Sequence, residues 1–146
     1  MSGQDNEALK RELAGVIKGI FDAFERHDTA HSETVMTPET TIWDVFQPHL
    51  VRGPAERNKF RQADQAQMQS RGKLKITYDE PVVDAWGDAA IARYYLNFEY
   101  QPPNAIKGQV RITDVFRKMN GQWKIVHHHE GIVPAGIPPI TEKEQG

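Results

Sequence analysis

Apolar side chains recur at every third or fourth position near the start of the chain. Between residues 7 and 27 they form one stripe, made of Leu9, Leu13, Val16, Ile17, Ile20, Phe21 and Phe24. This spacing predicts a long amphipathic helix whose stripe packs against a core. Two shorter helices are expected around residues 32–36 and over residues 54–70. For the second of these, Pro54 suits a first helical turn and Arg71-Gly72 ends the segment.

The period of the apolar positions changes to two after residue 73, which is typical of strands. Strands are predicted over residues 40–46, 49–52, 74–78, 89–100, 109–119 and 122–130. Asn120-Gly121 is a strong hairpin signal that joins the last two. Helices followed by successive antiparallel strands indicate an α+β fold. We therefore expect one cone-shaped domain over residues 1–146. In it, a long N-terminal helix and shorter helices pack in a curved, mostly antiparallel sheet, with residues 1–6 and 132–146 as flexible or partner-packing tails.

Composition narrows the functional classes. The chain has 146 residues, 18 of them basic and 20 acidic, and a formal net charge of -2. No basic block is present, so binding of nucleic acid by neutralising phosphates is disfavoured. The longest apolar runs are only a few residues, so no membrane-spanning segment is predicted. The absence of cysteine rules out disulfides and thiol catalysis, and it fits a cytoplasmic protein.

Two aspartates are candidates for acid–base chemistry. Asp114 lies on an apolar strand face, with Val110, Ile112 and Phe116. Burial of an unpaired carboxylate is costly and raises its pKa, which prepares a proton donor or a base. The competing interpretation is a structural acid bonded to a backbone amide or an arginine. Asp44, in "TTIWDVF", lies in a strand with two partly apolar faces, so its direction stays open.

Three consecutive histidines end the last predicted strand, in "WKIVHHHEG". If Trp123 and Ile125 face the core, strict alternation turns His127 and His129 inward and His128 outward. We favour this register because Trp123 is the large apolar anchor of the strand. A carboxylate beside an imidazole favours the imidazolium, so an inward histidine next to an aspartate would form a proton-transfer pair.

The alternative register has a bulge after Gly121, which would bury Val126 and His128 instead. In the favoured register, Asp114 lies across the hairpin from the inward histidines and is expected beside at least one of them. A His-x-His pair is weak evidence for a metal without a third defined ligand, so no metal site and no cofactor are predicted.

The segment "ITDVFRKMNGQWKIVHHHEG", preceded by a strand, a loop and a long N-terminal helix, resembles the nuclear transport factor 2-like superfamily. Within it, the chain is most similar to SnoaL-like proteins, ketosteroid isomerases and the association domain of calcium/calmodulin-dependent kinase II. The resemblance covers roughly Leu9 to Gly131. It implies the cone fold, which hosts many functions.

The resemblance to ketosteroid isomerase implies roles for both aspartates. Asp44 precedes Gly53 by nine residues, as the general base of that family precedes a glycine, and Asp28 lies sixteen residues upstream as in the family. The second aspartate of the family lies in an "IDVMR"-like strand, which "TDVFR" matches, so Asp114 takes the oxyanion-hole position. The oxyanion tyrosine of the family falls at Ile20, so half of that oxyanion hole is missing.

The ending "NGQWKIVHHHEG" is also close to that of the kinase association domain, a non-catalytic oligomerisation hub. The pocket arginines of the hub fall at Leu96 and Asp114, so its anion-binding pocket is not reproduced. Like the relatives, the chain is expected to form a homodimer through the outer sheet face, which carries Arg111, Thr113, Val115 and Arg117.

Two functional classes follow. One is a cofactor-independent isomerase, cyclase or dehydratase that acts by Asp/His proton transfer on a small hydrophobic carbonyl compound. The other is a non-catalytic ligand-binding or oligomerisation domain. The catalytic candidates are Asp44, Asp114, His127 and His129. The expected apolar wall of the substrate site consists of Phe21, Phe24, Trp43, Tyr94, Leu96, Phe98 and Phe116.

Overall fold

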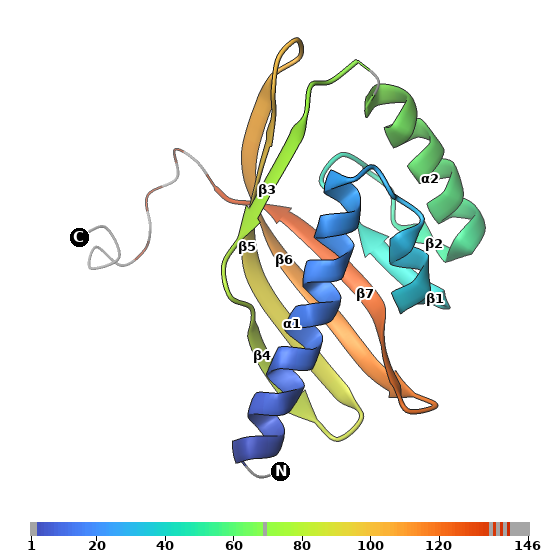
Figure 1. Ribbon diagram of the computed structural model, residues 1–146, viewed down its shortest axis with the longest axis vertical. Helices are drawn as coiled ribbons and strands as arrows, with labels where there is room; N and C mark the ends of the chain where they lie inside the picture. The colour runs from blue at the N-terminus through green and yellow to red at the C-terminus, as the bar shows by residue number, and fades with distance from the viewer. Residues whose placement is uncertain (1–2, 69, 135, 137, 139, 141–146) are drawn as a thin grey trace.

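Two α-helices, a short 3-10 helix and a seven-stranded sheet make up the part of the chain that the structure describes. The computed structural model describes residues 3–68, 70–134, 136, 138 and 140. In chain order the elements are α1 (Gly3–Glu25), the 3-10 helix η1 (His31–Val35), β1 (Met36–Trp43), β2 (Val51–Arg52), α2 (Gly53–Met68), β3 (Leu74–Tyr78), β4 (Val82–Trp86), β5 (Ala89–Tyr100), β6 (Ile106–Met119) and β7 (Gln122–Ile132). Helix α1 crosses in front of the sheet, and α2 stands beside β1 and β2 (Figure 1). This arrangement confirms the predicted α+β cone.

The sheet has the strand order β2-β1-β7-β6-β5-β3, and β4 also pairs with β5. Every pair is antiparallel except β1 with β7, which is parallel. The long strand β5 pairs with β4 along its first half and with β3 along its second half. The central strands β6 and β7 therefore lie between β5 and β1, where their inward side chains face the helices.

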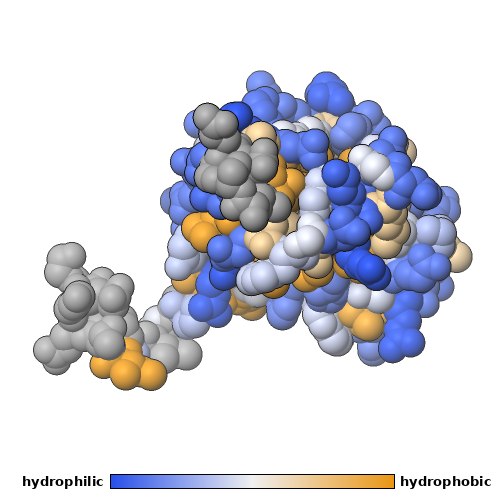
Figure 2. All heavy atoms as spheres, turned by 90° about the horizontal axis from the view of Figure 1, so that it is seen from below, coloured by the Kyte–Doolittle hydropathy of each residue, from blue (hydrophilic) through white to orange (hydrophobic). Residues whose placement is uncertain are grey.

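The core lies between α1 and the inner face of the sheet. Leu13 and Ile17 of the predicted helical stripe are completely buried, and so are Phe116 and Ile125 from the sheet. Burial of each such side chain contributes roughly 1.5–3 kcal/mol. Seen from the end where α1 begins, the surface is mainly hydrophilic, and apolar residues show in small patches between polar ones (Figure 2). In the part of the chain that the structure describes, no helix is both long and apolar enough to cross a membrane.

A buried arginine fixes α2 to the start of the sheet. The Arg57 side chain is almost inaccessible and donates to the carboxylate of Glu33 from Nε (2.8 Å) and Nη2 (3.0 Å). It also donates to the carbonyl oxygens of Thr40 (3.0 Å) and Thr37 (3.0 Å). Burial of a charge is tolerated only when it is paired and hydrogen-bonded. Arg57 meets both conditions, so it holds α2, η1 and β1 in one arrangement.

Several predicted boundaries are wrong. Helix α1 begins at Gly3 instead of residue 7, and β4 is a strand that the sequence did not reveal. Strand β1 was predicted over residues 40–46 but runs from Met36 to Trp43. It ends there because the carboxylate of Asp44 accepts the backbone N–H of Phe46 (2.8 Å), which stabilises a turn in place of a strand. Of the predicted tails, residues 1–2, 135, 137, 139 and 141–146 lie outside the described residues.

Candidate active site

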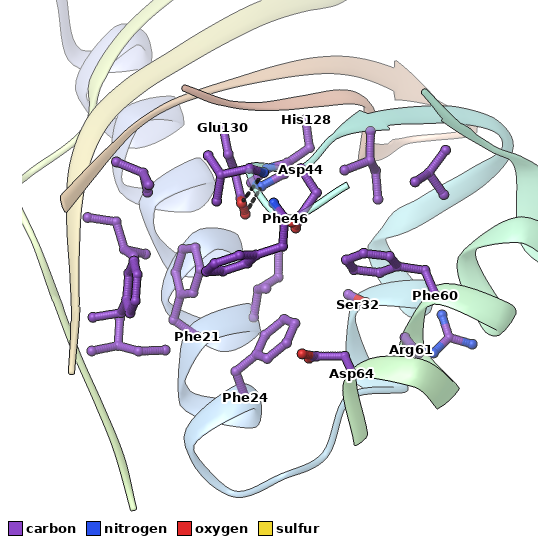
Figure 3. Close-up of a pocket in the computed structure, with 18 of the residues that line it drawn as sticks. Phe21, Phe24, Ser32, Asp44, Phe46, Phe60, Arg61, Asp64, His128 and Glu130 are labelled. Carbon is purple, nitrogen blue, oxygen red and sulfur yellow. Dashed lines mark hydrogen bonds and ion pairs between the residues drawn. The ribbon is translucent and has the colours of Figure 1, made fainter. Parts of the chain in front are cut away.

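A cavity of about 170 Å³ opens between α1, α2 and the inner face of the sheet. Apolar side chains, aliphatic and aromatic, make most of its wall, and Figure 3 shows Phe21 and Phe24 on α1 and Phe60 on α2 among them. Of the wall residues predicted from the sequence, the cavity is lined by Phe21, Phe24, Tyr94, Leu96 and Phe98.

Trp43 and Phe116 were also predicted in this wall, and for them the prediction is wrong. Phe116 is completely buried in the core. Trp43 is 41% exposed and pairs in register with His129, on the outer side of the sheet. Both residues are large and apolar, and the sequence pattern does not separate a core or surface position from a cavity position.

A bulge decides which histidine enters the cavity. In the pairing of β6 with β7, Phe116 lies opposite Ile125 but Val115 lies opposite His127, so the register skips Val126. The extra residue reverses the faces of the strand beyond it. His128 is therefore the inward histidine and lies opposite Asp114. The prediction that His127 and His129 point inward and His128 outward is wrong.

His128 lies between two carboxylates. Its Nδ1 is 2.5 Å from Oδ1 of Asp114, and its Nε2 is 3.0 Å from Oε2 of Glu130. The hydroxyl of Tyr94 donates to the other oxygen of Asp114 at 2.7 Å. A continuous chain of hydrogen bonds thus runs from Tyr94 in the core to Glu130 at the cavity, where Figure 3 shows Glu130, His128 and Asp44 close together. The expected aspartate–histidine contact is present, with a different histidine.

The charge states of the residues in this hydrogen-bond chain follow from their contacts. Burial alone would lower the pKa of His128, but the charges and hydrogen bonds of Asp114 and Glu130 outweigh burial and raise it well above its ordinary value. His128 is therefore an imidazolium near neutral pH. Burial and the neighbouring charge of Asp114 raise the pKa of Tyr94 well above its ordinary value, so its hydroxyl keeps its proton and donates.

Asp44 and Glu130 form a carboxyl pair at the cavity. Burial, the negative charge of Glu130 and a hydrogen bond with Glu130 raise the pKa of Asp44 to about 7. Burial would also raise the pKa of Glu130, but its hydrogen bonds and charge interaction with His128 hold it below its ordinary value. Near neutral pH the pair therefore shares one proton, which resides mainly on Asp44.

A molecule in the cavity can contact only part of this cluster of ionisable residues. Asp114 is 1% exposed, whereas the side chains of His128 and Glu130 are 13% and 19% exposed. Asp44 is half-buried in the turn after β1. A bound molecule would therefore meet Asp44 and Glu130 first. Sequence reasoning missed Glu130 and placed His128 outward, although Glu130 follows His128 by two residues and thus shares its strand face.

His127 and His129 lie on the opposite side of β7. Nδ1 of His127 is 2.7 Å from the hydroxyl of Thr41, and the two imidazole rings lie 6.3 Å apart. Burial, and then the neighbouring histidines, lower the pKa of His127, so this ring is neutral over most of the neutral range. Neither ring lines the cavity.

The sequence matches the model of the SnoaL-like domain over residues 14–135, which is most of the chain. The chain belongs to the SnoaL-like domain family. Membership confirms the resemblance to nuclear transport factor 2-like proteins that the sequence predicts. No match was found among curated proteins.

The solved structures that share this fold belong to proteins with different names and described roles. A nuclear transport factor 2-like superfamily protein from Salmonella enterica has a TM-score of 0.76 and 21% identity, over 90% of this chain and 96% of its own. A protein from Shewanella frigidimarina, proposed to be a ketosteroid isomerase, has a TM-score of 0.66 and 24% identity, over 80% and 92%. The association domain of calcium/calmodulin-dependent kinase II from C. elegans has a TM-score of 0.68 and 22% identity, over 88% and 99%. At these identities the likeness shows the fold alone.

Proposed function

We propose that this SnoaL-like protein binds a small hydrophobic carbonyl compound in its cavity and moves a proton on it, as a cofactor-independent isomerase, cyclase or dehydratase. The observation that carries the proposal is the position of the Asp44 carboxyl group, which lines a mainly apolar cavity together with Glu130. Burial and the negative charge of Glu130 raise the pKa of Asp44 to about 7. A general base or acid is most effective when its pKa lies near the working pH. We also propose a cytoplasmic location, which the absence of cysteine supports.

The carboxyl pair supplies the chemistry in this proposal. Ionised Asp44 removes the proton from the carbon next to the carbonyl group, and the resulting acid returns it to another position of the substrate. Glu130 adjusts the basicity of Asp44 through their hydrogen bond and its charge. The His128 imidazolium keeps Glu130 ionised and offsets the negative charge that develops on the substrate. Asp114 and Tyr94 act behind His128 as positioning residues.

The size of the cavity limits the substrate. A closed apolar cavity of roughly 150 Å³ holds one benzene molecule. The cavity here has about 170 Å³ and is partly open to the solvent. It therefore suits a compound with one ring inside the cavity, and any further part of the molecule would extend through the opening.

The test is exchange of the protons next to the carbonyl group of cyclohexanone in D2O, followed by NMR. We expect the wild type to accelerate the exchange, and Asp44→Asn to lower the rate by about 10²–10⁴ because it removes the base. Asp28→Asn is a matched control, because the Asp28 side chain is half exposed and lies outside the cavity. Wild-type exchange no faster than that of Asp44→Asn would contradict the proposal.

The outer face of the sheet supports the alternative function, a ligand-binding or association domain. Tyr95 is 45% exposed and pairs in register with Arg111 of β6, on the same face as Trp43. Exposed aromatic residues and arginine are enriched at protein interfaces. This composition supports the homodimer expected from the sequence, with or without catalysis in the cavity.

Sedimentation velocity tests the homodimer. We expect the wild type to sediment as a dimer at micromolar concentration and Tyr95→Asp to sediment as a monomer, because a carboxylate in the centre of the interface would be buried without a partner. Ile106→Asp is the control, because Ile106 is also about half exposed but belongs to the opposite face of β6. A wild type that is monomeric would exclude both the dimer and the association function.

A further inference from the structure

The turn that carries Asp44 also carries an exposed phenylalanine at the opening of the cavity. Phe46 lies two residues after Asp44, between β1 and β2. Its side chain is 66% exposed and yet lines the cavity. Figure 3 shows it reaching from the side of Asp44 into the space in front of the α1 phenylalanines. A ring that is both exposed and part of the lining lies where the cavity meets the solvent.

The backbone of this turn is held by the two carboxyl groups of the candidate site. The carboxylate of Asp44 accepts the N–H of Phe46 at 2.8 Å, and its carbonyl oxygen accepts the N–H of Gln47 at 3.1 Å. Glu130 accepts the N–H of Val45 at 3.4 Å. Loops with exposed side chains and few buried contacts are the segments that open most easily. The position of Phe46 thus depends on these hydrogen bonds more than on packing.

The other side of the opening is rigid. The ring of Phe98 on β5 lies 6.1 Å from that of Phe46, edge to face. Phe98 rests on Gly108 of β6, where a β-carbon would come within 3.0 Å of its ring. The ring of Tyr100 lies 6.4 Å further along the same strand. Phe98 is therefore fixed by the sheet, whereas Phe46 can move with its turn.

We propose that Phe46 is the gate of the cavity, and that the side chain of Asp44 sets its position through the hydrogen bond to the Phe46 N–H. The gate selects flat, narrow molecules, because an entering ring must pass between Phe46 and Phe98. The inference rests on the proposed function in one respect, that the cavity is the ligand site. Asp44 then has two roles, because it holds the gate through which the substrate enters and is also the base that transfers the proton.

The association and dissociation rate constants of a ligand distinguish a residue that gates the cavity from a residue that only forms its wall. A gate residue hinders both entry and exit, so its removal raises the association and the dissociation rate constants together. A wall residue contacts only the bound ligand, so its removal raises the dissociation rate constant alone. Phe60 on α2 is a suitable wall control, because it has the same side chain and lines the cavity away from the turn.

The experiment is stopped-flow fluorescence with 2-naphthol, a flat neutral probe. For Phe46→Ala we expect both rate constants to rise by about tenfold, with a nearly unchanged dissociation constant, as for removal of a loop that gates access. For Phe60→Ala we expect only faster dissociation. If Phe46→Ala changes the dissociation rate constant alone, or changes neither, Phe46 is not a gate.

Two Asp44 variants test the coupling. Asp44→Asn keeps an oxygen that accepts the Phe46 N–H, so both binding rate constants should match those of the wild type although proton exchange is much slower. Asp44→Ala removes the acceptor, so both rates should rise as in Phe46→Ala. Wild-type rates in Asp44→Ala would overturn the coupling. Failure of 2-naphthol to bind the wild type would overturn the ligand cavity and the gate together, whereas binding with unchanged rates in Phe46→Ala overturns the gate alone.

Discussion

Replacement of His128 by alanine is expected to lower the free energy of unfolding by about 3–5 kcal/mol, because it leaves Asp114 and Glu130 inside the protein without their shared cation. The same substitution at His127 or His129 is expected to cost at most about 1 kcal/mol, because both lie on the outer side of the sheet. Urea denaturation of the three variants at pH 6 measures the difference. The three adjacent positions are matched controls for one another.

The pH dependence of stability gives a second measure of His128. Its pKa is raised in the folded protein, so its stabilising contribution is complete below the unfolded pKa of roughly 6.5 and is lost as the pH rises through the folded value. The wild type should therefore lose stability toward alkaline pH, and His128→Ala should lose less. A variant at His127 with an effect as large as that of His128→Ala would contradict the assignment of the inward histidine.

Asp44→Asn is expected to stabilise the protein by about 1–2 kcal/mol at pH 8, while it slows proton exchange by about 10²–10⁴. The folded pKa of about 7 lies above the ordinary value of 3.8, so the fold disfavours the ionised form. Below pH 3.8 both states are protonated and Asp44 has no effect. Between pH 4 and 7 the unfolded state releases the proton first, and the folded state loses relative stability until the pH exceeds 7. The estimate is well below the full shift because Asp44 is only half-buried.

Thermal unfolding of both proteins from pH 4 to 8 tests this prediction. The melting temperatures should coincide near pH 4 and separate as the pH rises, with the variant above the wild type. The variant amide can still donate to Glu130 and accept from the Phe46 N–H, so the turn should stay intact. If the variant is less stable than the wild type at pH 8, ionised Asp44 stabilises the folded protein, and the prediction is contradicted.

The sequence predicts those parts of the molecule that depend on local periodicity. The α1 stripe and the inward position of Asp114 follow from spacings of 3.6 and two residues, and the structure buries Leu13, Ile17 and Asp114 accordingly. The turn at Asp44 could not be separated from a strand, because both conformations fit a short run of β-branched and aromatic residues. What ended the strand was a side-chain hydrogen bond.

The inward histidine could not be predicted because β7 pairs on both sides. It is antiparallel to β6 and parallel to β1, and both pairings contain a register shift. The position of a bulge depends on how the strand fits between two neighbours, and strict alternation carries no information about this fit. Glu130 was missed for the same reason, since its direction follows from that of His128.

The single extra residue at Val126 determines which ionisable side chains of β7 join Asp114 at the cavity. In an unbulged hairpin with Phe116 opposite Ile125, alternation would place His127 opposite Asp114 and His129 next along the inner face. An imidazole would thus meet Asp114 in either register. The neighbour beyond it would differ, since the unbulged strand would offer a second imidazole where the bulged strand offers Glu130. Together with Asp44, the unbulged hairpin would present two acids and two imidazoles, whereas the bulged hairpin presents three acids and one imidazole, although the sequence of the hairpin is the same.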